Sequence, residues 1–188
     1  MQASEDLTCG TESDWLTFVC ISDTHSQQYK MAPLPEGDVL LHSGDFSQKG
    51  YPQEISDFSH WLGQQNFKHK VVICGNHEIT FDLKMEKSLS QQFQMESINF
   101  AQTKALLKNC IYLEETSVTI DGIKIYGYPQ TPAFYDWGFN SGPEELKDLS
   151  GAVPEDSDIV LIHGPPHNIL DGCADGFHAG CKSSRKNL

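Results

Sequence analysis

Six polar side chains stand directly after apolar runs of the sequence: Asp23, His25, Asp45, Asn76, His77 and His163. Each run has the length and composition of a buried strand, so the polar residues fall where strands would end. Carboxylates, imidazoles and an amide oxygen are ligands that suit Mn, Fe or Zn, and Mg less well. No cysteine belongs to the set, which argues against a structural zinc site. These residue types therefore predict a centre for divalent metal ions.

The spacing of the six residues suggests how two ions could share them. Asp23 and His25 are two positions apart just after a strand, so both can bind one ion. Asp45 lies in a tight turn, where its carboxylate can bridge two ions roughly 3.5–4 Å apart and offset their repulsion. Asn76 and His163 would serve the second ion, and the amide oxygen adds a ligand without adding charge.

Two histidines are candidates for contact with a substrate. His77 directly follows Asn76, so its side chain is expected to point away from that ligand and toward a bound phosphate. There it could protonate the leaving oxygen or stabilise charge developing on phosphorus. His167 follows two prolines in the loop after His163, and a substrate contact and a surface position are both open for it.

The charge of the chain limits its partners. The 188 residues include 13 Lys plus Arg against 26 Asp plus Glu, for a formal net charge of -13. This balance argues against general binding of nucleic acid or of an acidic membrane, which needs a positive surface. The sequence has a single arginine, Arg185, so an arginine clamp for phosphate is not expected in the body of the chain. Two metal ions could instead hold the phosphate oxygens and activate a water molecule for attack on phosphorus.

The cysteines and the apolar runs of the sequence indicate the cellular compartment of the protein. None of the six cysteines forms a Cys-x-x-C pair, and the first residues lack the basic and apolar parts of a secretory signal. No run approaches the roughly 20 apolar residues of a membrane helix. We therefore expect a cytoplasmic protein with reduced thiols. A zinc site in the C-terminal stretch is an alternative whose spacing matches no common zinc pattern; its donors would be His167, Cys173, His178 and Cys181.

Apolar runs and turn residues divide the chain into short elements around this centre. Strands are predicted over residues 16–21, 38–42, 69–74, 110–113, 118–120, 123–128 and 158–163. Helices are predicted over 52–65, 98–107 and 141–149. Residues 84–94 are expected to form a surface insertion, and residues 1–14 a flexible acidic leader before one domain over 15–188.

The order of these elements predicts the fold class. Strands alternate with helices early in the chain, and a tight hairpin at Asp121-Gly122 follows. This order predicts an α/β domain with a mixed sheet. Ligands of such sheets bind beyond the carboxyl ends of the strands, so the strand ends would gather the six polar residues at one rim.

The blocks Asp23-Thr24-His25, Gly44-Asp45, Gly75-Asn76-His77-Glu78 and His163-Gly164 occur in this order along the chain, with Trp137-Gly138-Phe139-Asn140 between the last two. The series resembles the calcineurin-like metallophosphoesterases and is most similar to the animal metallophosphoesterase-domain-containing proteins. The resemblance runs from about residue 16 to residue 181.

This resemblance implies a four-layer α/β/β/α sandwich with two divalent ions, Mn or Fe first and Zn or Mg as alternatives. It also implies phosphodiesterase activity that is weak toward cyclic nucleotides. It assigns Asp23, His25 and Asp45 to one ion. It assigns Asp45, Asn76 and His163 to the other ion, with His77 beside the scissile phosphate.

The sequence departs from the family at one block. The family carries a final Gly-His-x-His, and no such block follows His163 here. The resemblance then implies one missing ligand for each ion and a second sheet without its C-terminal strands. Two functions remain open. One is a metal-dependent hydrolase of phosphoric esters acting on a small phosphoester or nucleotide. The other is a catalytically impaired nucleotide- or metal-binding regulatory module or fragment. The oligomeric state is left open.

Overall fold

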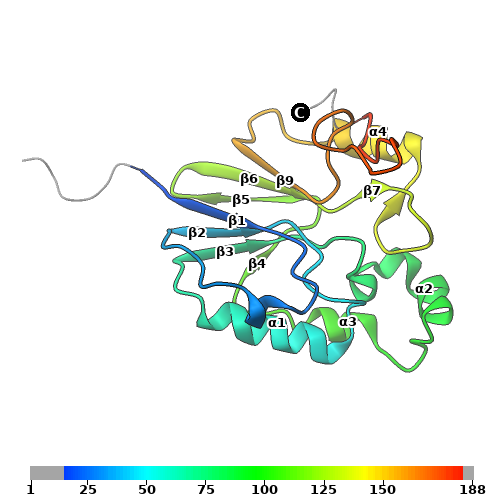
Figure 1. The fold of residues 1–188 in the computed structure, drawn as a ribbon, viewed down its shortest axis with the longest axis horizontal. Coiled ribbons are helices and arrows are strands. Elements are labelled where there is room, and N and C mark those ends of the chain that lie inside the picture. The colour runs from blue at the N-terminus through cyan, green and yellow to red at the C-terminus, as the bar shows by residue number, and fades with distance from the viewer. Residues whose placement is uncertain (1–14, 184–188) are drawn as a thin grey trace, which may run out of the picture.

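The chain folds into four layers, as the computed structural model of residues 15–183 shows (Figure 1). Helices α1 (Pro52–Gln64) and α3 (Phe100–Lys104) cover one face of a first sheet, and a second sheet covers its other face. Helix α4 (Pro143–Gly151) lies on the far side of the second sheet. The predicted α/β/β/α sandwich is therefore confirmed, while the predicted leader, 1–14, lies outside the described residues.

The first sheet is parallel throughout. Its strands are β1 (Phe18–Ile21), β2 (Val39–His42), β3 (His69–Val72) and β4 (Ile111–Tyr112), in that order across the sheet. The register pairs the first residues of β1, β2 and β3 with one another, so these strands also end together. The loops after β1, β2 and β3 consequently leave the sheet at the same edge.

The second sheet is mixed. Strands β5 (Thr116–Ile120) and β6 (Ile123–Tyr128) form the predicted antiparallel hairpin, and β9 (Ile159–Ile162) pairs with β6 in parallel. Both turn residues of the hairpin have positive φ, 47° at Asp121 and 88° at Gly122, as a tight two-residue turn requires. Two short strands, β7 (Thr131–Pro132) and β8 (Asn140–Ser141), form a separate pair that the sequence did not predict.

Alternation along the strands builds a separate core on each face. In β2, Val39 and Leu41 pack between the two sheets, whereas Leu40 packs with the α1 side chains Phe58 and Leu62. Burying each such side chain contributes about 1.5–3 kcal/mol. On the outer face of the second sheet, tyrosines of β6 pack with α4. The first sheet is thus covered on both faces, whereas α4 covers β6 on the outer face of the second sheet and leaves β5 largely exposed.

The predicted surface insertion contains helical structure that the sequence did not predict. Residues 84–94 are mostly exposed, and they contain helix α2 (Glu86–Gln92) and part of a single turn of 3-10 helix, Leu83–Met85. Leu89 of α2 is 2% exposed and packs with Ile79 and Phe100 in a small core of its own. One leucine among polar residues gave no helical periodicity, so the sequence pattern did not reveal this core.

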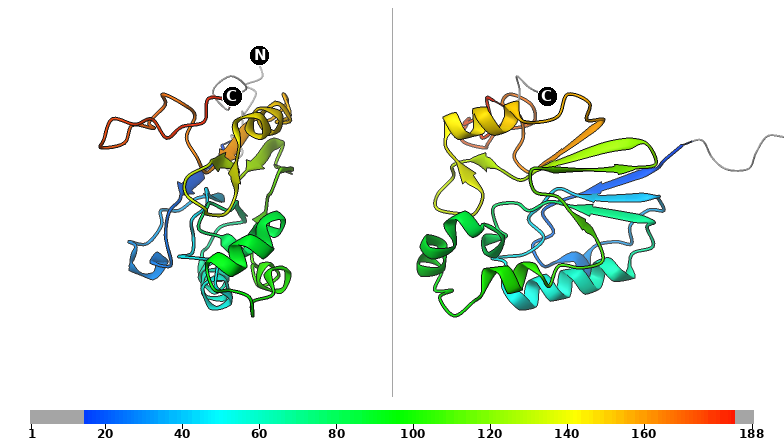
Figure 2. Two further views of the ribbon diagram at one scale, coloured as in Figure 1. Left: turned by 90° about the vertical axis from the view of Figure 1, so that its right-hand side faces the viewer. Right: turned by 180° about the vertical axis from the view of Figure 1, so that it is seen from behind.

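The remaining boundaries differ by a few residues from the predictions. Other 3-10 turns are Gln28–Lys30 and Ile79–Phe81. Figure 2 shows, from behind, α1 running along the first sheet and α4 above the second. Among residues 15–183, the structure contains no helix with the length and apolarity of a membrane span.

Candidate metal centre

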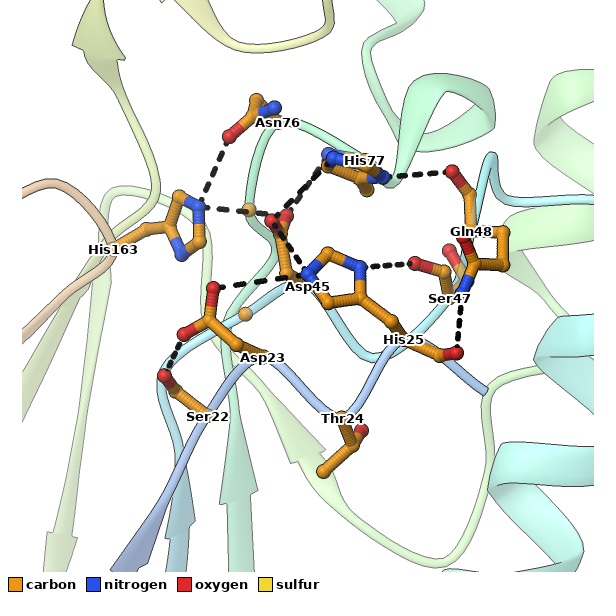
Figure 3. Close-up of polar contacts among 12 residues, drawn as sticks. Ser22, Asp23, Thr24, His25, Asp45, Ser47, Gln48, Asn76, His77 and His163 are labelled. Atoms are coloured by element: carbon orange, nitrogen blue, oxygen red, sulfur yellow. Dashed lines mark hydrogen bonds and ion pairs between the residues drawn. The ribbon is translucent and has the colours of Figure 1, made fainter. Parts of the chain in front are cut away.

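Loops from both sheets meet at the carboxylate of Asp45, which is 4% exposed (Figure 3). The Nε2 atoms of three histidines face it. His25 Nε2 lies 3.7 Å and His77 Nε2 3.9 Å from Asp45 Oδ2. His163 Nε2, at the end of β9, lies 3.4 Å from Asp45 Oδ1. Four strand ends therefore converge as the sequence predicted.

The other two predicted ligands lie at the rim of this group. Asp23 Oδ1 lies 3.9 Å from His25 Nε2, and its second oxygen accepts a hydrogen bond from the Ser22 hydroxyl. Asn76 Oδ1 lies 3.1 Å from His163 Nε2. All six predicted residues thus belong to one cluster (Figure 3).

Tight loops point the side chains inward. Asp23, His25 and Asp45 all have positive φ, between 41° and 54°, which non-glycine residues adopt rarely and at some cost. Backbone hydrogen bonds hold these loops together: Asp23 N–H donates to Gly44 O at 3.0 Å, and His25 N–H to Asp45 O at 2.9 Å. Strained backbone retained in this way is typical of functional sites.

Two glycines allow the loops to approach one another. Gly44 has φ 97°, and a Cβ at this position would lie 2.5 Å from the backbone nitrogen of Gly75. A Cβ at Gly75 would meet the Asp45 carboxylate and would lie 2.5 Å from His163 Cε1. Glycine is therefore required at both positions for Asp45 and His163 to meet.

Each of the three imidazoles is oriented through its Nδ1 atom. His25 Nδ1 lies 3.3 Å from Ser47 O, His77 Nδ1 2.8 Å from Gln48 O, and His163 Nδ1 2.9 Å from Ser43 O. A carbonyl oxygen can only accept, so Nδ1 carries the proton. In the neutral ring, Nε2 then keeps a lone pair directed at the cluster, the arrangement typical of metal-binding histidines.

The fully buried carboxylate of Glu78 links the central loops. It accepts hydrogen bonds from the backbone N–H of Asp45 and Gly75, each at 2.8 Å, and from the N–H and hydroxyl of Ser47 at 2.9 and 2.7 Å. Burial and the Asp45 charge raise the pKa of Glu78 to about 8. No sequence pattern predicted a role for Glu78, although it stands in the same block as Asn76 and His77.

A second buried group, His42, connects the first two loops. Its Nδ1 accepts from Gly44 N–H at 3.2 Å, and its Nε2 lies 3.2 Å from the Thr24 hydroxyl. Burial, and then the charge of His163, lower the pKa of His42 to about 3. His42 is therefore neutral at physiological pH, and its ring links the loops after β1 and β2 by hydrogen bonds.

Asp45 and His163 stabilise one another's charges. Burial opposes the charge of each group, but their mutual hydrogen bond and attraction are stronger. The pKa of Asp45 is lowered, and the pKa of His163 is raised to about 9. A divalent ion between these atoms would take the place of the proton on His163.

The donor atoms fit two divalent ions. His25, Asp45 and His77 form one group, and Asp23, Asp45 and His163 form another, each with ligand atoms within 4.8 Å of one another. Asp45 is common to both groups, as a bridging ligand must be. The grouping differs in one respect from the expected one, because Asp23 falls with His163 and His77 falls with His25.

The structure gives no support to a second metal site near the C-terminus. Among residues 15–183, the only groups of three or more donors suited to an ion are the two at Asp45, so the tail zinc alternative is not supported. His167 Nδ1 lies 3.4 Å from the buried carboxylate of Asp171, and His178 Nδ1 lies 2.7 Å from it. Cys20, Cys74, Cys110 and Cys173 are free thiols, and Cys9 lies outside the described residues.

Comparisons with known proteins agree with this geometry. A family model described as calcineurin-like phosphoesterase matches residues 16–185. Human metallophosphoesterase domain-containing protein 1 is 43% identical over 163 residues, which cover 82% of this chain and 50% of that protein. A 3′,5′-cyclic-nucleotide phosphodiesterase of Nostoc sp. is 24% identical over 148 residues, which cover 75% of this chain and 46% of that protein. The chain thus spans about half the length of both relatives.

A solved crystal structure supports the fold. It superimposes with a TM-score of 0.56 at 12% identity, covering 90% of this chain and 78% of that one. The match to residues 16–185 and the 43% identity, together with the polar strand ends that the sequence placed in order, show that the chain belongs to the calcineurin-like phosphoesterase family.

Proposed function

We propose that the chain is a metal-dependent hydrolase of phosphoric esters that acts on phosphodiesters. The observation that carries this proposal is the Asp45 carboxylate, which is shared by two groups of metal-ligating side chains. Membership in the phosphoesterase family supports the same reaction class.

Five side chains would hold the two ions. The family resemblance assigns Asp23, His25 and Asp45 to one ion and Asp45, Asn76 and His163 to the other, and this assignment is kept in the proposal. The side chains in the structure group Asp23 with His163 and His77 with His25. The mixed nitrogen and oxygen donors suit Mn or Fe best, with Zn or Mg as alternatives. When bound, the ions would neutralise the phosphate and lower the pKa of a water molecule near phosphorus.

We assign His77 a place beside the scissile phosphate. Its Nδ1–H is held by Gln48 O at 2.8 Å, so Nε2 is the atom that can exchange a proton with the substrate. A proton carried at Nε2 would pass to the leaving oxygen, or its positive charge would stabilise the transition state. The 23% exposure of the His77 side chain leaves it accessible to a ligand.

The substrate is proposed to be a small phosphodiester or nucleotide. The name of the Nostoc relative supports a nucleotide, and the net charge of -13 argues against a polyanion. His167, in the loop that leaves the metal centre after His163, is proposed to contact the part of the substrate distant from phosphorus. Its side chain is 24% exposed.

The proposal is tested by hydrolysis of bis(p-nitrophenyl) phosphate. The protein is stripped with chelator, resupplied with Mn, and compared with Asp45→Asn and with Asp136→Asn, an exposed control. We expect the first variant to lose at least about 100-fold in rate, because it removes the shared ligand, and the control to stay within twofold. Equal rates for Asp45→Asn and the unmodified chain would overturn the proposal. Calorimetric binding of Mn and a nucleotide without turnover would leave the regulatory binding module in its place.

A further inference from the structure

The indole of Trp137 stacks on the imidazole of His77. Their ring centroids are 4.2 Å apart and their planes differ by 23°. The ring of His25 meets the same imidazole edge-on, at 4.5 Å and 70°. His77 is therefore confined by rings as well as by its hydrogen bond to Gln48 O.

The segment that carries Trp137 is fastened to the loop that carries His77. Gly138 N–H donates to Asn76 O at 3.1 Å, and Phe139 N–H donates to the buried Asp82 carboxylate at 2.9 Å. A Cβ at Gly138 would lie 3.2 Å from Asn76 O, so the two backbones are in close contact. Phe139 is itself 2% exposed. The position of the indole is thus fixed by buried contacts on its C-terminal side.

The same indole is supported from helix α2. The ring of Phe93, just after α2, lies 5.3 Å from that of Trp137. Gln92 Nε2 donates to Asp136 O at 3.3 Å, next to the tryptophan in sequence. Segments far apart in the sequence therefore meet at Trp137. Their contacts fix the indole, and the indole in turn restricts the orientation of the His77 ring.

This restraint bears on the atom that the proposed reaction needs. A ring held only at Nδ1 could still swing about that hydrogen bond, and Nε2 would leave the cluster. A stacked indole favours one ring plane, and in that plane Nε2 lies 3.9 Å from Asp45 Oδ2. Displacing a catalytic group by about 1 Å can cost up to about 100-fold in rate.

We propose that Trp137 is a positioning residue for His77, holding the imidazole in the plane that directs Nε2 at the metal centre. The kinetic consequence rests on the proposed function, whereas the effect on the ring itself does not. In this proposal Trp137 acts only through His77 and does not touch the reacting atoms.

A double-mutant cycle tests the kinetic consequence with bis(p-nitrophenyl) phosphate and Mn. Trp137→Ala should lower kcat about tenfold or more and change KM less than threefold. Trp137→Phe should recover most of the rate because it keeps a stacking ring, and Tyr135→Ala, a 78% exposed neighbour, should have no effect. In a His77→Ala background, Trp137→Ala should cost less than twofold more. An equal loss in both backgrounds, or no loss of kcat, would overturn the proposal.

The orientation of the His77 ring is observed by nuclear Overhauser effects between imidazole ring protons. The unmodified chain and Tyr135→Ala should show ring-proton contacts between His77 and His25, whose rings meet edge-on at 4.5 Å, and Trp137→Ala should show them weakened or lost. A cooperative thermal transition in each variant shows that it is folded. If the unmodified chain hydrolyses nothing, the proposed function fails and the NMR result alone decides. Undiminished His77–His25 ring contacts in a folded Trp137→Ala would overturn the positioning role.

Discussion

His163 Nε2 lies 3.4 Å from Asp45 Oδ1, so the end of β9 in the second sheet meets the loop after β2 in the first sheet. This contact brings a ligand from each sheet to one point. Because the carboxylate of Asp45 raises the pKa of His163 to about 9 against the effect of burial, the pair also makes stability depend on pH in a defined direction.

The metal-free protein should lose stability as pH rises from about 6.5 to above 9. A histidine whose pKa is higher in the folded than in the unfolded protein stabilises the fold. This contribution is complete below the unfolded pKa of about 6.5 and is lost as the pH rises through the folded pKa of about 9. Thermal unfolding in EDTA between pH 6 and pH 10 measures it. Glu78, whose pKa is raised to about 8, contributes to the slope below that pH, so His163→Gln should remove most of the slope between about pH 8 and pH 9, whereas the exposed His60→Gln should retain it. An unchanged slope in His163→Gln would contradict the pairing.

Glu78→Gln should weaken both the fold and the centre. The amide NH₂ would face backbone donors of Asp45, Gly75 or Ser47, leaving buried groups unpaired. We expect a loss on the order of 3 kcal/mol in unfolding free energy and a 10- to 100-fold loss in Mn affinity. Urea unfolding and calorimetry check both values, with the exposed Glu155→Gln as control. Unchanged Mn affinity in a folded Glu78→Gln would show that Glu78 does not position the ligands.

Gly75→Ala should separate Asp45 from His163. The added Cβ would collide with the carboxylate and lie 2.5 Å from the imidazole, so one of them must move. We expect a cost of about 1–3 kcal/mol in stability and a clear loss of Mn affinity. Gly172→Ala, where a Cβ meets nothing within 4 Å, is the matched control. Calorimetric Mn titrations of the two variants decide, and equal affinities would refute the close approach.

Mn should raise the melting temperature through Asp45. An ion that binds only the folded state at 100 times its Kd stabilises by about 2.7 kcal/mol, which is about 5–10 °C for a chain of this size. Adding chelator should reverse the shift. Asp45→Asn should show little of it, and Asp136→Asn should show all of it. A full shift in Asp45→Asn would place the ion elsewhere.

Much of the fold and the cluster could be predicted from the sequence. The strands before Asp23, Asp45 and His163 are short apolar runs with abrupt polar ends, and parallel strands bring such ends together. The hairpin at Asp121-Gly122 follows from turn chemistry alone. These features are local, so each leaves a direct trace in the residue pattern.

The remainder depends on contacts between distant segments. Strands β7 and β8 have two residues each, too few for any periodicity. Glu78 and Trp137 have no pattern that announces their partners, because their roles arise only when the loops meet. The Nδ1 hydrogen bonds of the histidines go to backbone carbonyls, which the sequence does not specify.

The location of bound ions tests the central claim most directly. Crystals of the chain are soaked in Mn, and anomalous diffraction is recorded near the Mn absorption edge. The account predicts two peaks roughly 3.5–4 Å apart with the Asp45 carboxylate between them. A single peak, or none in contact with Asp45, would contradict it.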